Sequence, residues 1–202
     1  MSKGADTKQA ILDEATRIAS MVGLGGVTIG SLAARTQLSK SGLFAHFRSK
    51  ESLQLQVLEH ATGKFVDGVI LPALDTPRGE PRLRELFDGW LRWASDALPG
   101  GCLFVAAGTE FDDQPGPVRD RLVRNQRDWM DVIAQVFRTG VADGPFRPDA
   151  DPDQFAQDLY GVMLGYHHAN RLLRDPQAEA RARRAFEVLL DAARDPQQNA
   201  RN

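Results

Sequence analysis

The sequence predicts an all-α protein with an N-terminal three-helix helix-turn-helix domain followed by a larger C-terminal helical domain. Two observations support this prediction. Apolar residues recur at helical spacing through almost the whole chain. Breaks such as Pro99-Gly100-Gly101 and Pro115-Gly116-Pro117 divide the chain into helix-length segments, and no convincing strand or repeat lies between them.

The first two helices are predicted from periodicity and from their end residues. Between Thr7 and Val22, the apolar stripe of an amphipathic helix is formed by Ile11, Ala15, Ile18, Ala19 and Val22. Gly23 stands where a left-handed C-terminal cap is favoured. Thr28 has a hydroxyl that can accept from free amides, so it is expected to cap a second helix ending at Thr36.

Two more serine caps predict the next helices. Ser39 is expected to open a helix over 40–47, and Ser49 to open a fourth helix. The fourth helix is expected to run unbroken from Lys50 to near residue 71, with Pro72 as its boundary. In the second half, Pro81 and Asp151 are expected at helix starts. The further predicted helices are 82–98, 102–111, 118–141, 152–174 and 178–194.

Composition excludes several classes of protein. The chain has 202 residues, 42% of them apolar, which is enough for one core or two small ones. A single cysteine, Cys102, excludes an internal disulfide and a cysteine-based metal site, and a buried structural role is favoured over a redox role. No signal-peptide h-region and no run of about 18 apolar residues occurs, so a cytoplasmic protein without membrane contact is expected.

Charge is distributed unevenly along the chain. Seven basic and five acidic side chains give the first 60 residues a charge of +2, and since the total is −2 the remainder carries −4. A basic N-terminal segment and an acidic remainder suggest two functions, one of which involves contact with phosphate groups.

Residues 28–50 have the spacing of a helix-turn-helix motif, whose second helix can enter a major groove. The leading turn of that helix, 39–42, is small and polar, and its free amides suit a phosphate. Leu43 and Phe47 lie four residues apart and are expected to face the core of the three helices.

The letters TIGSLA at 28–33 and LSKSGLFAHFRSKESL at 38–53 closely resemble the DNA-binding region of the tetracycline-repressor (TetR) family. The resemblance covers about residues 7–60, and it implies a DNA-binding domain over 1–50, a connecting fourth helix to about residue 72 and a ligand-binding and dimerisation domain over 51–202. The residues that the resemblance places at double-stranded DNA are Thr28, Ser39, Lys40, Ser41, Gly42, Phe44, His46, Arg48 and Lys50.

Phe44 departs from the family pattern, because members often have a phosphate-binding tyrosine there. Its ring offers only apolar contact, so affinity is expected to depend more on Lys40, Arg48 and Lys50. A core position for Phe44 remains an alternative, as do purely solvated positions for His46 and Arg48.

Aromatic and sulfur-bearing side chains concentrate after residue 85, and the resemblance favours an effector pocket among them over a purely structural core. The expected ligand-binding residues are Trp90, Trp93, Phe104, Phe111, Trp129, Tyr160, Met163 and His167. Asn170 and Glu110 are further polar candidates. His167 and His168 are adjacent and diverge on a helix, so no metal site and no cofactor is expected.

The last two predicted helices have apolar stripes that are expected to form a dimer face, as in relatives where they build a four-helix bundle. The expected interface residues are Phe155, Leu159, Val162, Tyr166, Phe186, Leu189 and Leu190.

These observations favour a homodimeric repressor that reads a palindromic operator and is released by a small, mainly apolar effector. The sequence contains no general base and nucleophile at a useful spacing, so it does not favour an enzyme. The alternatives are an architectural DNA-binding protein without an effector and a small helical enzyme that uses the C-terminal pocket.

Overall fold

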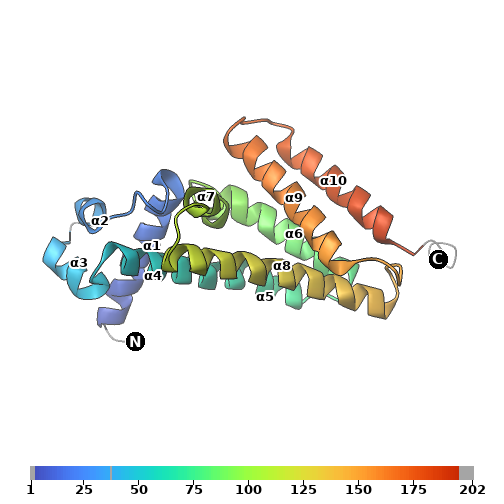
Figure 1. Ribbon diagram of the computed structural model, residues 1–202, viewed down its shortest axis with the longest axis horizontal. Helices are drawn as coiled ribbons and strands as arrows, with labels where there is room; N and C mark the ends of the chain where they lie inside the picture. The colour runs from blue at the N-terminus through green and yellow to red at the C-terminus, as the bar shows by residue number, and fades with distance from the viewer. Residues whose placement is uncertain (1–2, 37, 196–202) are drawn as a thin grey trace. The chain divides into compact units, whose positions relative to one another are not determined.

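The computed structural model describes residues 3–36 and 38–195, with side chains from Thr7 onward. Helices follow one another along this part of the chain (Figure 1), and its strand-like pairing is one isolated bridge between Phe146 and Arg194. The all-α class is therefore confirmed. The helices are α1 (Lys3–Val22), α2 (Ile29–Thr36), α3 (Lys40–Phe47), α4 (Lys50–Phe65), η1 (Val66–Ile70), α5 (Leu71–Leu74), α6 (Glu80–Arg92), η2 (Trp93–Ala97), α7 (Leu103–Phe111), α8 (Pro117–Asp143), α9 (Pro152–Arg171) and α10 (Ala178–Ala193).

The predicted helix ends are confirmed where a side chain or a glycine marks them. Gly23 has a φ of 85° after α1. Thr28 Oγ1 accepts from the Ser31 amide at 3.0 Å, while the Thr28 amide donates to Ser31 Oγ at 2.9 Å. Ser49 Oγ likewise accepts from the Ser52 amide at 3.0 Å, and the Asp151 carboxylate accepts from two amides of α9. Local sequence signals were sufficient at these positions.

The prediction that the fourth helix ends before Pro72 is wrong. The helical path continues through the π-helical segment η1 into α5, which contains Pro72 near its start. A proline ring normally collides with the carbonyl four residues earlier, here that of Gly68. The wider π-helical turn, which contains Gly68, provides the space for that ring.

The chain forms two compact units that differ from the predicted domains. The first unit combines the chain up to Phe65 with residues 95–125, and the second combines residues 66–94 with those from 126 onward. Helix α7 therefore belongs to the same unit as α1–α4. The predicted boundary at residue 50 followed chain order, whereas the units depend on contacts between distant segments. None of the helices among the described residues is long and apolar enough to span a membrane.

Aromatic rings form much of the core of the second unit. Phe137 stacks on Phe146 and on Phe155, with ring centroids 4.6 and 4.2 Å apart. Phe87 of α6 stacks on Phe186 of α10 at 4.3 Å. These stacked pairs hold the last two helices against α6 and α8.

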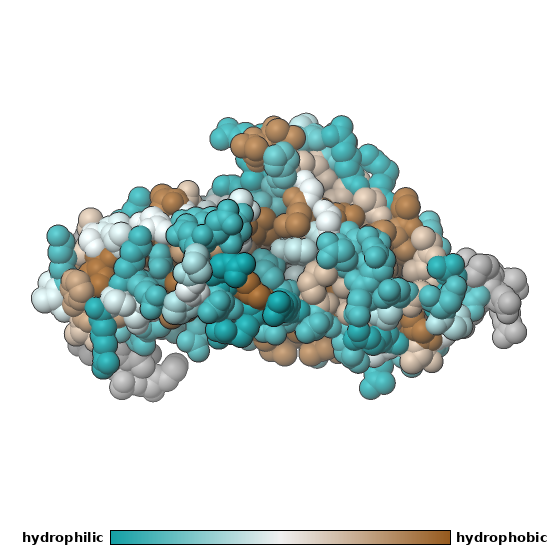
Figure 2. All heavy atoms as spheres, viewed as in Figure 1, coloured by the Kyte–Doolittle hydropathy of each residue, from teal (hydrophilic) through white to brown (hydrophobic). Residues whose placement is uncertain are grey.

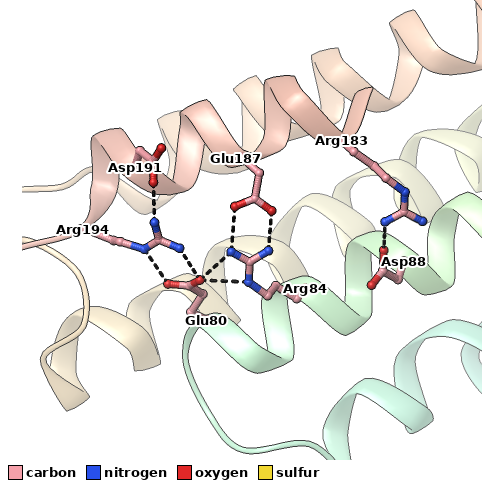
Figure 3. Close-up of polar contacts among 7 residues, drawn as sticks. All are labelled: Glu80, Arg84, Asp88, Arg183, Glu187, Asp191 and Arg194. Carbon is pink, nitrogen blue, oxygen red and sulfur yellow. Dashed lines mark hydrogen bonds and ion pairs between the residues drawn. The ribbon is translucent and has the colours of Figure 1, made fainter. Parts of the chain in front are cut away.

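An ion-pair network joins α6 to the C-terminal end of α10 (Figure 3). The Glu80 carboxylate accepts from Arg194 at 2.6 and 2.9 Å, and from Arg84 at 2.8 Å. Arg84 also donates to Glu187 at 2.5 and 2.8 Å. The hydrogen bonds from Arg194 lower the pKa of Glu80 most; burial opposes the shift, and Arg84 adds to the lowering.

Glu80→Gln is expected to reduce the free energy of unfolding at neutral pH by about 1–2 kcal/mol, between the values of exposed and buried charged hydrogen bonds. Because the pKa of folded Glu80 lies below its ordinary value of 4.5, its stabilising effect is complete above that value and is lost as the pH falls through the folded pKa. Urea unfolding from about pH 7 to about pH 3.5 should show the two proteins converging in acid.

The matched control is Glu179→Gln, which removes an exposed ion pair with Arg183 on α10. Its effect should stay below about 0.5 kcal/mol. A Glu80→Gln protein that differed from wild type equally at both ends of the pH range would contradict this assignment.

Candidate DNA interface

Helix α3 presents its leading turn to solvent. Ser39, Lys40, Ser41 and Gly42 are exposed, and Ser39 Oγ accepts from the Gly42 amide at 3.1 Å. On the opposite face, Leu43 and Phe47 are completely buried, as predicted. The small residues of the turn therefore stand outside, and two large side chains anchor the helix.

The remaining predicted DNA-binding residues have mixed exposure. Phe44 is 52% exposed, so the alternative that it is a core residue is not supported. Arg48 and Lys50 are exposed, and Arg48 ends α3 with a φ of 60°. His46 is half-buried, with its ring centroid 6.1 Å from that of Phe47. The exposed cations lie at both ends of α3, where a phosphate backbone would need them.

Helix α4 is tied to α1 by a polar cluster. His60 Nε2 lies 2.9 Å from Asp13 Oδ1, and Lys64 Nζ lies 2.5 Å from the same oxygen. Burial alone would raise the pKa of Asp13, but the hydrogen bonds from Lys64 and His60 outweigh it, and the pKa lies below its ordinary value. Asp13 therefore remains a carboxylate that holds the two helices together.

The turn before α2 is fixed by two residues that sequence reasoning did not place there. Glu110 of α7 accepts hydrogen bonds from the amides of Leu24 and Gly25, both at 2.8 Å. Gln54 of α4, itself buried, donates to the Leu24 carbonyl at 3.1 Å. Glu110 was expected among the polar groups of an effector pocket, and this is corrected. The partners in these contacts are 30 to 86 positions apart in the sequence, so no local sequence pattern could predict them.

The predicted effector residues divide between the two units. Phe104 and Phe111 lie in the first unit, where the Phe104 ring contacts Phe65 edge-on at 5.9 Å. The six others lie in the second unit, namely Trp90, Trp93, Trp129, Tyr160, Met163 and His167. Phe104 and Phe111 are at most 8% exposed there.

Two polar groups of the second unit stand out among these six. Tyr160 donates to Gln126 Oε1 at 2.6 Å. The buried Nε2 atom of His167 finds no hydrogen-bond partner within the described residues. Burial, followed by the charges of Arg171 and His168, lowers the pKa of His167, so its imidazole is neutral at physiological pH.

The predicted dimer residues require correction. Phe155, Leu159, Tyr166, Phe186 and Leu190 are at most 7% exposed within one chain. Their stripes cover the core of the second unit, because helical periodicity identifies an apolar face without saying what covers it. Val162 and Leu189 are half-buried.

Other apolar residues are exposed to solvent on α9 and in the turn that follows it. Leu164 is 38% exposed, and Leu172 and Leu173 in the turn are 71% and 62% exposed. Figure 2 shows an apolar patch over this α9–α10 turn. Val188 of α10 is 64% exposed.

Comparison with known families agrees with this architecture. Residues 11–57, which contain α2 and α3, match the sequence model "Bacterial regulatory proteins, tetR family". Residues 79–186 match "Tetracyclin repressor-like, C-terminal domain". The chain belongs to the TetR family. Membership of this family makes the protein a DNA-binding transcriptional regulator.

Individual TetR-family proteins are similar along most of the chain. The transcriptional repressor KstR2 of Mycolicibacterium smegmatis is 27% identical over 175 residues, covering 82% of each chain. A TetR regulator of Chloroflexus aurantiacus has a TM-score of 0.84 at 26% identity, covering 95% of this chain and 96% of that one. The structure of AibR, solved with isovaleryl coenzyme A and operator DNA, has a TM-score of 0.65 at 22% identity, covering 78% and 84%.

Proposed function

We propose that this TetR-family protein is a homodimeric repressor that reads a palindromic operator through α3 and responds to a small effector. The observation that carries the proposal is the surface of α3. Its leading turn is small, polar and exposed above a serine cap, while Leu43 and Phe47 anchor it from behind. Such a helix can approach base edges closely without disturbing its own core.

The proposed DNA contacts are those that the family resemblance implies. Lys40 and Lys50 are exposed ammonium groups suited to phosphates, together with Arg48 and the hydroxyl of Thr28. Phe44 offers an exposed apolar ring for a thymine methyl or a sugar. Ser39, Ser41, Gly42 and His46 complete the proposed reading surface.

The proposed effector site lies in the second unit. Trp90, Trp93, Trp129 and Met163 supply apolar surface, and they suit a mainly apolar molecule. The imidazole of His167, whose Nε2 atom has no hydrogen-bond partner within the described residues, would orient it, with Tyr160 as a second polar contact. The AibR structure, with both an acyl-coenzyme A and operator DNA, supports effector control in a protein of this fold.

A second copy of the chain is the proposed partner for the open face of α9 and α10. Gly161 and Gly165 lie in the middle of α9, and a Cβ atom at either would meet nothing within 4 Å. Mid-helix glycines destabilise a helix by about 1 kcal/mol each, but they let another helix approach closely. The neighbouring exposed leucine, Leu164, supplies apolar area for such a contact.

Selection of bound duplexes from a random pool tests the proposal directly. A palindrome is expected, because a twofold dimer presents two α3 helices to half-sites about one helical turn or more apart. Enrichment of a single, non-repeated half-site would contradict the dimer. Binding to many unrelated duplexes, with no response to any small molecule, would instead favour an architectural DNA-binding protein.

Lys40→Ala is expected to weaken binding to the selected operator and to an unrelated duplex by the same factor. The dependence of log affinity on log salt concentration should become less steep by about 1 per subunit, as for a lost phosphate contact. His46→Ala should instead change the selected sequence if the ring reaches a base edge. Fluorescence anisotropy at several salt concentrations measures both.

Arg138→Ala is the matched control, because it removes a positive charge from α8 in the second unit. Its affinity and salt dependence should equal those of wild type. A Lys40→Ala protein with an unchanged salt dependence would show that Lys40 is only a surface lysine.

A further inference from the structure

The turn between α1 and α2 is held by a carboxylate from far along the chain. The two oxygens of Glu110 each accept one backbone amide, Oε2 from Leu24 and Oε1 from Gly25, at 2.8 Å. A charged acceptor makes such bonds stronger than those between neutral groups. The carboxylate therefore occupies a small anion site formed by consecutive amides of the turn.

The backbone of Leu24 is held through both its amide and its carbonyl group. Its amide donates to Glu110 of α7, its carbonyl accepts from Gln54 of α4, and its side chain is completely buried. Helices α1, α4 and α7 thus meet at one residue, directly before the helix-turn-helix. A displacement of the Glu110 carboxylate with α7 would change the hydrogen bond to the Leu24 amide.

The glycines of the turn are needed for this contact. A Cβ at Gly25 would lie 2.3 Å from Glu110 Oε1, and one at Gly23 would lie 3.0 Å from Oε2. Because neither Gly23 nor Gly25 has a side chain, the carboxylate can approach the amides of Leu24 and Gly25 this closely. Gly23 also has the positive φ of 85° that favours glycine.

We infer that Glu110 is a positioning residue for operator binding, because its carboxylate fixes the turn from which α2 and α3 are presented. The inference rests on the proposed role of α3. Helix α7 lies in the segment that matches the C-terminal family model. Through Glu110 it binds directly to the turn in the segment that matches the N-terminal model. Glu110 touches no base or phosphate in this proposal, so its effect on DNA passes through the turn.

Glu110→Gln is expected to weaken binding to the selected operator by about tenfold, since one neutral carbonyl replaces two charged acceptors and its amide group faces a backbone amide. Affinity for an unrelated duplex should stay within about twofold, because the phosphate-binding cations are untouched. Hydrogen exchange at the Leu24 and Gly25 amides should accelerate. Asp113→Asn, an exposed change of equal charge two residues beyond α7, should leave all three readouts unchanged.

A double-mutant cycle separates positioning from loss of stability. Gly25→Ala should reproduce the operator defect, since its methyl group displaces the flexible carboxylate. In a Glu110→Ala background the same substitution should have little further effect, because the carboxylate is gone. Additive effects of the two changes would overturn the inference.

The outcomes also distinguish this inference from the proposed function. A wild-type protein that binds no duplex would contradict the role of α3 itself. Wild-type operator binding that Glu110→Gln leaves unchanged, even with a lower thermal midpoint, would show that Glu110 is structural only.

Discussion

Gly100→Ala is expected to destabilise the first unit by about 3 kcal/mol or more. A Cβ atom at Gly100 would lie 1.6 Å from the carbonyl oxygen of Ser20 and 2.0 Å from its carbonyl carbon. These are backbone atoms of α1, so no side-chain rotation relieves the collision. The loop would have to separate from α1 and lose the 3.1 Å hydrogen bond from the Gly100 amide to Ser20 Oγ.

Urea unfolding of Gly100→Ala and of two reference variants measures this effect. Ser20→Ala removes only the hydrogen bond and should cost about 1 kcal/mol. Gly63→Ala, on α4 in the same unit, meets nothing within 4 Å and should raise stability by up to about 1 kcal/mol through helix propensity. A Gly100→Ala protein as stable as wild type would show that the loop does not approach α1 this closely.

The role of Gly100 illustrates what the sequence could and could not reveal. The run Pro99-Gly100-Gly101 predicted a helix break, and α6 with η2 indeed ends before it. The close approach of Gly100 to Ser20 joins residues 80 positions apart, and no periodic or motif signal encodes it. Glu110 was misassigned for the same reason.

Patterns that depend on neighbouring residues were predicted well. Ser39, Thr28 and Ser49 cap helices through amides three positions ahead, so a few letters of sequence are sufficient. The predicted dimer-interface residues illustrate a second difficulty. Leu159 and Phe186 lie on genuine apolar stripes, but a stripe that covers the chain's own core has the same periodicity as one that meets a partner.

The sequence predicted a core position for Phe47 and left the position of Phe44 open, and the structure separates the two rings. They lie three residues apart on α3, yet Phe47 is completely buried and Phe44 is 52% exposed. A helix turns about 300° over three residues, so two aromatic rings at this spacing can fall on either side of the boundary between core and solvent. Only the packing of α3 against its neighbours decides which ring is inside.

Phe47→Ala is therefore expected to reduce the free energy of unfolding by about 3–5 kcal/mol, because it leaves a cavity behind the proposed reading surface. Phe44→Ala should stay within about 0.5 kcal/mol of wild type, as for an exposed position. Operator affinity should fall in both variants, for different reasons. In Phe47→Ala it falls because α3 loses its anchor, and in Phe44→Ala because an apolar contact with DNA is lost.

Paired measurements on the two variants discriminate these causes. Lowering the temperature should restore the operator affinity of Phe47→Ala as its folded fraction recovers. It should not restore the affinity of fully folded Phe44→Ala. If Phe44→Ala bound the operator as wild type does, its ring would be an exposed apolar residue without a role in DNA binding, and the affinity of α3 would depend on the cations at its two ends.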